Sequence, residues 1–166
     1  MNPKNRWFWS LAATVLVCDV VTKRIAEQAL QPRHVPHEIV GDVLRFTLTY
    51  NRGAAFSMSL GDYSRWGFAI MALIVLTVLW RTLATAPDTD RWQGAAIGLV
   101  SGGALGNLVD RLRHAEGVVD FIDMGIGDTR FWTYNVADMG VTFGAIMLII
   151  TMLTAPKEPS PSEKIL

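Results

Sequence analysis

The sequence WQGAAIGLVSGGALGNLVDR, which spans residues 92–111, combines the length of a membrane-spanning helix with glycine at every fourth position. A helix that crosses a bilayer needs about 20 largely apolar residues, and residues 92–109 meet this requirement. Residues four apart lie on one face of a helix, where glycines allow a second helix to approach closely. We therefore expect a tightly packed transmembrane helix whose contact face carries Gly94, Gly98, Gly102 and Gly106.

Three further apolar segments of similar length occur at about residues 7–25, 66–83 and 136–153. The chain of 166 residues is 51% hydrophobic and 18% charged, whereas an ordinary soluble domain carries about 25% charged residues. Tryptophans stand near the ends of these segments, as is typical of a membrane interface. The sequence therefore predicts a mainly α integral membrane protein with four transmembrane helices, in a single membrane-embedded domain over residues 1–155. The polar residues 156–166 are predicted to form a disordered tail.

The first apolar segment also has features of a cleavable signal peptide, because Lys4 and Arg6 precede an apolar run that includes Cys18. Cleavage before that cysteine needs a small residue directly ahead of it, and Val17 occupies this position. Three more apolar segments follow in the chain. We therefore interpret the first segment as a retained transmembrane helix.

The connection between the first two predicted helices contains an alternating pattern. Leu44, Phe46, Leu48 and Tyr50 alternate with polar residues. A period of two residues is typical of a strand with one buried face. We therefore expect a small β-sheet on the membrane surface, within about residues 35–60.

Charge and potential metal ligands narrow the possible functions. Lys and Arg number 15, as do Asp and Glu, and no basic cluster indicates a nucleic-acid partner. One cysteine and three histidines without ligand spacing disfavour a metal centre. The positive charges divide almost evenly between the two sides of the predicted helices, so they do not fix the orientation in the membrane. We expect neither nucleic acid nor metal to bind.

Polar residues occur within the predicted helices, where a bilayer makes them costly. Asn107 and Asp110 follow Gly103 on one face of the third segment. A charged residue at the centre of a membrane costs about 2.5–3.5 kcal/mol, so such residues usually face protein or a water-filled cavity. Asp19 and Lys23 are four residues apart in the first segment, a spacing that allows an ion pair. We interpret this pair as structural, orienting neighbouring polar groups.

Two other carboxylates lie near the start of the fourth predicted helix. Asp120 stands among apolar residues, and an apolar environment raises the pKa of an unpaired carboxyl group. Asp138 follows Asn135 by three residues, the spacing of a helix N-terminal cap. If both carboxyls converge, they share one proton and can perform aspartic protease chemistry. The spacing leaves three other candidates open: Asp19, Asp110 and Asp123. No G-x-S-x-G motif supports a serine nucleophile.

Five blocks of the sequence match one known family in composition and order. They are residues 19–23 (DVVTK), 51–56 (NRGAAF), 102–111 (GGALGNLVDR), 118–121 (VVDF) and 135–138 (NVAD). With these blocks the chain resembles the bacterial lipoprotein signal peptidases, also called signal peptidase II. The resemblance implies an intramembrane aspartic endopeptidase that cleaves diacylglyceryl-modified prolipoproteins on the amino side of the lipidated cysteine.

The resemblance also implies roles for particular residues. It implies that Asp120 and Asp138, the pair described above, form the catalytic dyad. The implied supporting or substrate-binding residues are Asp19, Lys23, Asn51, Gly53, Asn107, Asp110, Arg111, Asn135 and Ala137. The family resides in the inner membrane with both termini cytoplasmic, which implies that the β-sheet is extracytoplasmic and that the active site lies toward the periplasm. It uses no metal or organic cofactor. The implied partners are lipid-modified prolipoprotein, membrane lipids and cyclic peptide inhibitors such as globomycin.

Two other functions stay open from the residues alone. A small proton- or ion-coupled transporter would use Asp19, Asp110 and Asp138 as a relay, but the apolar segments show no internal repeat. A non-catalytic scaffold would assemble through the glycine face of residues 94–106. That alternative leaves Asp120 and the other polar residues without a role.

Overall fold

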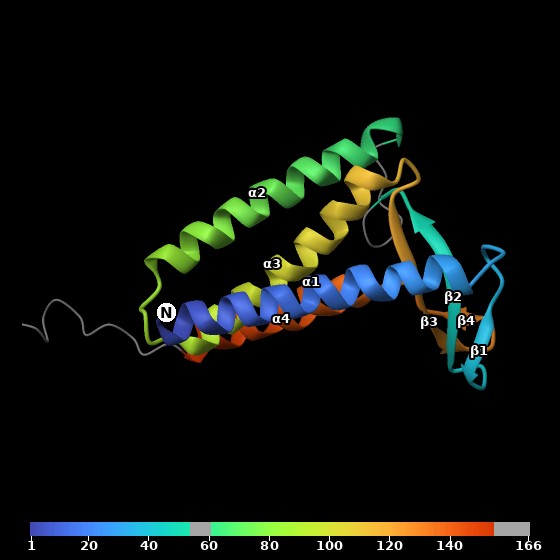
Figure 1. Ribbon diagram of the computed structural model, residues 1–166. Helices are drawn as coiled ribbons and strands as arrows, with labels where there is room; N and C mark the ends of the chain where they lie inside the picture. The colour runs from blue at the N-terminus through green and yellow to red at the C-terminus, as the bar shows by residue number, and fades with distance from the viewer. Residues whose placement is uncertain (54–60, 155–166) are drawn as a thin grey trace, which may run out of the picture.

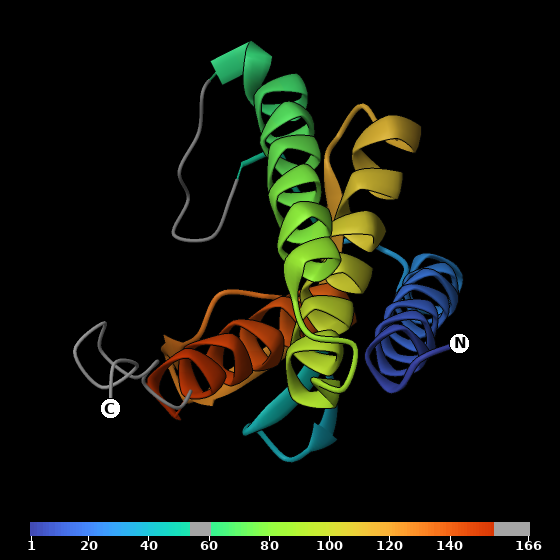
Figure 2. The same ribbon diagram turned by 90° about the vertical axis from the view of Figure 1, so that its left-hand side faces the viewer.

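The computed structural model describes residues 1–53 and 61–154, which form a bundle of four helices with a four-stranded sheet at one end (Figure 1). The helices are α1 (Pro3–Ala29), α2 (Ser64–Thr85), α3 (Arg91–Arg113) and α4 (Val136–Thr154). α3 packs against the other three, and α1 also packs against α4. Figure 2 shows α3 in the middle of the bundle, with α1 and α4 on either side of it.

The glycine face of α3 contacts α1, as the sequence predicts. A methyl group added at Gly98 would lie 2.6 Å from the backbone oxygen of Phe8, and one at Gly102 would lie 2.7 Å from that of Ala12. Gly94 faces the backbone of α1 at a similarly short separation. These distances leave no room for a side chain, so glycine is required where the two backbones meet.

The four predicted helical segments are confirmed as helices, but length and hydropathy indicate a membrane span for only some of them. Within the described residues, α2 and α4 are the two helices long and apolar enough to do so. α1 is less apolar because it contains the buried charged residues Asp19 and Lys23, and α3 because it contains glycines and the buried Asp110. Composition and length therefore support two of the four expected membrane spans.

The sheet takes its strands from two separate connections. β1 (His37–Val40) and β2 (Leu44–Asn51) precede α2, whereas β3 (Val118–Ile126) and β4 (Thr129–Arg130) lie between α3 and α4. Neighbouring strands are antiparallel, in the order β1-β2-β3-β4. The expected strand β2 is confirmed. β3 was not predicted, because its first half is buried on both faces and lacks an alternating pattern. Residues 54–60 of the expected β region lie outside the described residues.

The sheet buries polar side chains as well as apolar ones, although the sequence predicts a buried apolar face. Leu48 and Phe121 belong to an apolar cluster with Ala26 of α1 and with Leu30, which follows that helix. Thr47 is also buried, next to a register shift of β2 between Phe46 and Thr49, and donates a hydrogen bond to Asp123 at 3.0 Å. Polar groups that bond to one another can be buried like apolar ones, and the alternating pattern did not reveal these buried polar groups.

Replacing Gly98 by valine tests the contact between α1 and α3. The added side chain would collide with the backbone at Phe8, and overpacking of this kind typically costs about 1–3 kcal/mol. We expect the variant to unfold in detergent several degrees below wild type, as measured by a thermal unfolding scan. Val78→Ile, on the exposed surface of α2, is the control and should leave the unfolding temperature unchanged. Equal temperatures for both variants would contradict the contact.

Candidate active site

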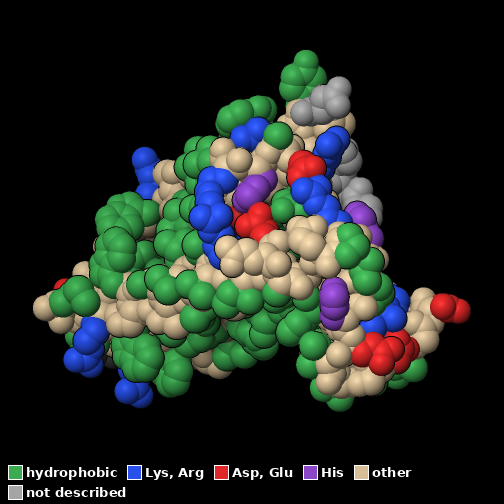
Figure 3. All heavy atoms as spheres, turned by 45° about the vertical axis from the view of Figure 1, so that its right-hand side comes forward, with side chains coloured by type: hydrophobic (Ala, Val, Ile, Leu, Met, Phe, Trp, Pro, Cys, Tyr) green, Lys and Arg blue, Asp and Glu red, His purple; other side chains and the backbone are tan. Residues whose placement is uncertain are grey.

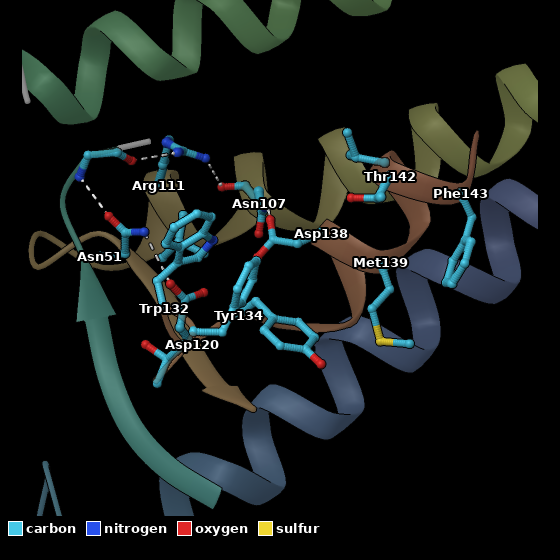
Figure 4. Close-up of a pocket in the computed structure, with 15 residues that line it drawn as sticks. Asn51, Asn107, Arg111, Asp120, Trp132, Tyr134, Asp138, Met139, Thr142 and Phe143 are labelled. Atoms are coloured by element: carbon cyan, nitrogen blue, oxygen red, sulfur yellow. Dashed lines mark hydrogen bonds between the residues drawn. The ribbon is translucent and has the colours of Figure 1, made fainter. Parts of the chain in front are cut away.

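A cavity of about 540 Å³ lies where the helices meet the sheet (Figure 4). Its polar wall combines residues of β2, β3, α3 and α4. Six of the predicted site residues line it: Asn51, Gly53, Asn107, Arg111, Asp120 and Asp138. The structure therefore brings together residues that are almost 90 positions apart in the sequence.

Asp120 enters the cavity from β3 and is only 2% exposed. Its Oδ1 accepts a hydrogen bond from the side-chain amide of Asn135 at 2.6 Å, and its Oδ2 accepts one from Asn51 at 3.2 Å. Burial and the nearby charge of Asp138 raise the pKa of Asp120 to about 7, although the two amide donors oppose the shift. Asp120 can therefore hold a proton near neutral pH.

Asp138 lies in the first turn of α4 and is less buried than Asp120. The N–H of Asp138 donates to Asn135 Oδ1 at 2.9 Å, and the N–H of Asn135 donates back to Asp138 Oδ2 at 3.2 Å. This reciprocal pair is a capping box, which confirms the cap expected from the sequence. Asp138 Oδ1 accepts a further hydrogen bond from Asn107 at 2.8 Å. The carboxylate thus caps the helix and faces the cavity as well.

Asn135 connects the two carboxyl groups. Its amide nitrogen donates to Asp120, while its amide oxygen accepts the N–H of Asp138. It also donates to the backbone oxygen of Val119 at 3.2 Å and is fully buried. One rigid side chain thereby fixes the end of α4 relative to β3, and Figure 4 shows Asp120 and Asp138 facing the same cavity.

Five predicted site residues lie behind the cavity: Asp19, Lys23, Asp110, Asn135 and Ala137. Lys23 forms ion pairs with Asp19 and Asp110 at 2.7 and 2.8 Å. The pair expected between Asp19 and Lys23 is therefore present, with a second carboxylate added to it. Asp19 Oδ1 also accepts the N–H of Ala137 at 2.8 Å, which ties α1 to the start of α4.

Arg111 links the cavity to the end of β2. Its guanidinium donates to the backbone oxygens of Asn107 and Gly53, each at 3.2 Å. The N–H of Gly53 in turn donates to Asn51 Oδ1 at 2.9 Å, so that the amide of Asn51 is turned with its nitrogen toward Asp120. The remainder of that sequence block, residues 54–56, lies outside the described residues.

The other carboxylates left open by the sequence have different surroundings. Asp123 forms ion pairs with Arg45 and Arg130 at 3.2 and 2.7 Å, outside the cavity. Burial alone would raise the pKa of Asp123, but hydrogen bonds from Arg130 and Thr47 outweigh it and lower the pKa. Asp19 and Asp110 are both engaged by Lys23 and do not line the cavity.

The apolar wall of the cavity was not predicted. It is formed by an aromatic segment before α4 and by the first turns of that helix: Phe131, Trp132, Thr133, Tyr134, Met139, Val141, Thr142 and Phe143. The rings of Phe131 and Trp132 lie 4.1 Å apart, and both are partly exposed. Three aromatic residues within four positions, directly ahead of Asn135, were the available signal.

These features define a class of protein. The outer surface of the helical bundle is apolar and exposed. At one end the bundle carries a cavity lined by two carboxyl groups, each of which accepts hydrogen bonds from amide groups, and the pKa of one of them, Asp120, is raised to about 7. Such a pair can hold one ionised and one protonated group side by side, which suits general acid–base chemistry. The class is that of membrane enzymes.

Comparison with known proteins places the chain within this class. Residues 11–154 match the family model described as signal peptidase (SPase) II. The lipoprotein signal peptidase of Hydrogenovibrio crunogenus is 43% identical over 147 residues, which cover 85% of this chain and 81% of the relative. That of Mycobacterium avium is 41% identical and covers 87% of this chain and 78% of the relative. The chain belongs to the signal peptidase II family.

A solved structure agrees with this assignment. A bacterial membrane enzyme determined by the in meso method at 2.3 Å resolution superposes with a TM-score of 0.78 and 32% sequence identity. The match covers 90% of this chain and 91% of that one. The alternative of an ion-coupled transporter receives no support from these relatives.

The raised pKa of Asp120 predicts a pH dependence of stability. Between about pH 4 and pH 7, the folded protein keeps a proton on Asp120 that the unfolded chain releases. The protonated carboxyl group of Asp120 therefore stabilises the folded protein at low pH, and this stabilisation is lost as the pH rises through 7. From about pH 5 to pH 8, we expect the free energy of unfolding of wild type to fall by on the order of 2–3 kcal/mol more than that of Asp120→Asn.

Thermal unfolding in detergent at both pH values measures this difference. Asp128→Asn, in the exposed turn between β3 and β4, is the matched control and should follow the wild-type pH dependence. A wild-type curve parallel to that of Asp120→Asn would show that Asp120 titrates normally.

Proposed function

We propose that this chain is an aspartic endopeptidase that removes the signal peptide from diacylglyceryl-modified prolipoproteins. It would cleave on the amino side of the lipidated cysteine. The relatives named above are lipoprotein signal peptidases, and the family is signal peptidase II. The observation that carries the proposed mechanism is the pair of carboxyl groups, Asp120 and Asp138, which line one cavity and are bridged by Asn135.

The pair performs hydrolysis with one proton shared between two carboxyl groups. The ionised carboxylate takes a proton from a water molecule, and the water oxygen attacks the carbon of the scissile amide. The protonated carboxyl polarises the amide and gives its proton to the developing oxyanion. The tetrahedral intermediate then collapses as its oxyanion returns that proton, and the leaving nitrogen receives the proton taken from water.

The shape of the cavity supports a lipid-modified peptide as substrate. The polar end of the cavity contains Arg111 and the dyad, whereas Met139 and Phe143 on α4 form its apolar end. These two residues are 39% and 59% exposed, respectively. A substrate that combines a peptide with acyl chains matches this division. Membrane lipids and cyclic peptides such as globomycin are the further partners that this proposal includes.

The proposal also places all four described helices across the bacterial inner membrane. Figure 3 shows hydrophobic side chains over the helical part of this face, with charged side chains around the sheet and at the opposite end of the helices. The partly exposed tryptophans Trp7, Trp80 and Trp92 lie near the end of the bundle away from the sheet, and Trp66 lies near the other. Interfacial tryptophans are typical of both membrane surfaces.

The buried charges of α1 and α3 are compatible with this placement because they bind one another inside the bundle. α1 begins and α4 ends at the end of the bundle away from the sheet (Figure 1). We assign that end, with both termini, to the cytoplasm, and the sheet and cavity to the periplasmic side. The tail of residues 156–166 stays on the cytoplasmic side in this arrangement.

Asp120→Asn and Asp138→Asn test the dyad. Removing either ionisable group leaves no acid–base pair, so we expect cleavage of a purified lipidated prolipoprotein to fall at least about a thousandfold. Gel mobility of the released mature lipoprotein measures the rate, and thermal unfolding confirms that each variant is folded. Asp128→Asn removes a carboxylate of the same region outside the cavity and should retain activity. Normal cleavage by a folded Asp120 or Asp138 variant would exclude that residue from the dyad.

Single cysteines test the orientation. In a Cys18→Ala background, Asp128→Cys lies in the turn between β3 and β4, and Thr89→Cys lies in the connection between α2 and α3. Both positions are exposed. In cells whose outer membrane is permeabilised, we expect an impermeant maleimide to label Asp128→Cys, and to label Thr89→Cys only after the inner membrane is broken. The reverse pattern would place the cavity on the cytoplasmic side.

A further inference from the structure

A lysine lies behind the cavity with three oxygens around its ammonium group. Lys23 is 2% exposed, and its ammonium nitrogen lies 2.7 Å from Asp19 Oδ2 and 2.8 Å from Asp110 Oδ2. It also donates to Oδ1 of Asn107 at 2.9 Å. These three oxygens enclose the buried ammonium, and Lys23 does not line the cavity where a substrate would lie. The direct contacts of Lys23 with the site are therefore these three partners, and its positive charge acts on Asp120 from a distance.

Two of the partners hold the main chain beside the dyad. Asp19 accepts the N–H of Ala137 at 2.8 Å, and Asp110 accepts the N–H of Val119 at 3.1 Å. Each of these N–H groups belongs to the residue directly before one aspartate of the dyad. The ion cluster around Lys23 therefore fixes the backbone at both catalytic positions.

The third partner, Asn107, contacts the dyad itself. A side-chain amide can present either its oxygen or its nitrogen to a neighbour, and its hydrogen-bond partners decide which. Because Lys23 donates to Oδ1 of Asn107, the Nδ2 group is turned toward Asp138 and donates to it at 2.8 Å. In the reverse orientation, the NH₂ group of Asn107 would face the ammonium of Lys23, and its oxygen would face the carboxylate of Asp138. Both contacts would be repulsive. The cation thus sets the direction of this hydrogen bond, together with the longer hydrogen bond that Asn135 Nδ2 donates to the same oxygen at 3.3 Å.

We propose that Lys23 is a positioning residue for the reaction, which orients the amide of Asn107 so that Asp138 is the ionised member of the dyad. The second oxygen of Asp138 accepts the N–H of Asn135 at 3.2 Å, so fixed donors face both of its oxygens. Asp120, the more deeply buried of the two, then carries the shared proton. This inference rests on the dyad proposed above and assigns the base and the acid within it.

The direction of the Asn107 amide, and not the field of the cluster, produces this effect. The charged groups around Asp138 are Asp19 and Lys23 of α1, Asp110 and Arg111 of α3, and Asp120 of β3. The positive charge of Lys23 is opposed by two carboxylates, so the cluster as a whole does not attract a further anion. A hydrogen bond aimed at Asp138 stabilises its ionised form without that attraction.

Two variants separate this role from simple structural support. The triple variant Lys23→Met, Asp19→Asn and Asp110→Asn removes three charges but keeps amide oxygens for the neighbouring N–H groups. Asn107→Leu removes the oriented amide and leaves both ion pairs intact. For each we expect KM for a lipidated prolipoprotein to change less than about threefold and kcat to fall about a hundredfold. The acidic limb of the kcat profile should move up by about one pH unit, because the ionised member of the dyad then loses an aimed hydrogen-bond donor.

Lys4→Met provides a matched control. Lys4 is also buried, at 3% exposed, but it lies at the opposite end of α1, where it binds Ala86 and Asp88. We expect this variant to keep the wild-type kcat and pH profile.

A folded triple or Asn107 variant with the wild-type acidic limb would overturn the proposal, even if its kcat were reduced. Failure of both to fold would also overturn it, because the cluster would then be a structural requirement alone. Absence of prolipoprotein cleavage by the wild-type protein would instead refute the proposed function.

Discussion

An unpaired charge in the apolar interior of a membrane bundle costs several kcal/mol, and the ion cluster between α1 and α3 satisfies this constraint. Lys23 lies between Asp19 and Asp110, and each carboxylate also accepts a main-chain N–H from another element. One cluster therefore joins α1, α3, α4 and β3 at a single point. The positions of Asp120 and Asp138 depend on it, because they belong to two of the elements that it holds.

The cluster in turn requires the close approach that glycine allows. A methyl group at Gly106 would overlap the carboxylate of Asp19, and one at Gly103 would overlap the backbone of Ala137. The glycine face and the charged residues are thus parts of one packing arrangement, in which small residues bring the backbones together and the charges pair beside them. α1 and α3 pack closely together. Glycines and paired charges form their contact, which explains why these two helices are less apolar than α2 and α4.

Local features of this structure could be predicted from the sequence, and the relations between distant segments could not. The helices follow from apolar runs, β2 from the alternation over residues 44–50, and the cap of α4 from the spacing of Asn135 and Asp138. The convergence of Asp138 with Asp120 depends on how α4 packs beside β3, which spacing does not encode. The residues indicated that pair beside other candidate carboxylates, and the family resemblance selected it. The aromatic wall before α4 was missed because its residues follow no helical or strand period.

The two carboxyl groups differ because they belong to different kinds of backbone. A helix N-terminus presents free N–H groups and the positive end of the helix dipole, both of which stabilise an anion. Asp138 occupies such a site. A position within a buried strand offers no comparable stabilisation, and removal from water favours the neutral carboxyl. Asp120, 2% exposed on β3, occupies that site and titrates near pH 7. The two different carboxyl environments that acid–base hydrolysis needs therefore arise from secondary structure. The amide of Asn107 adds a donor to Asp138, whereas the amide donors of Asn51 and Asn135 oppose the raised pKa of Asp120.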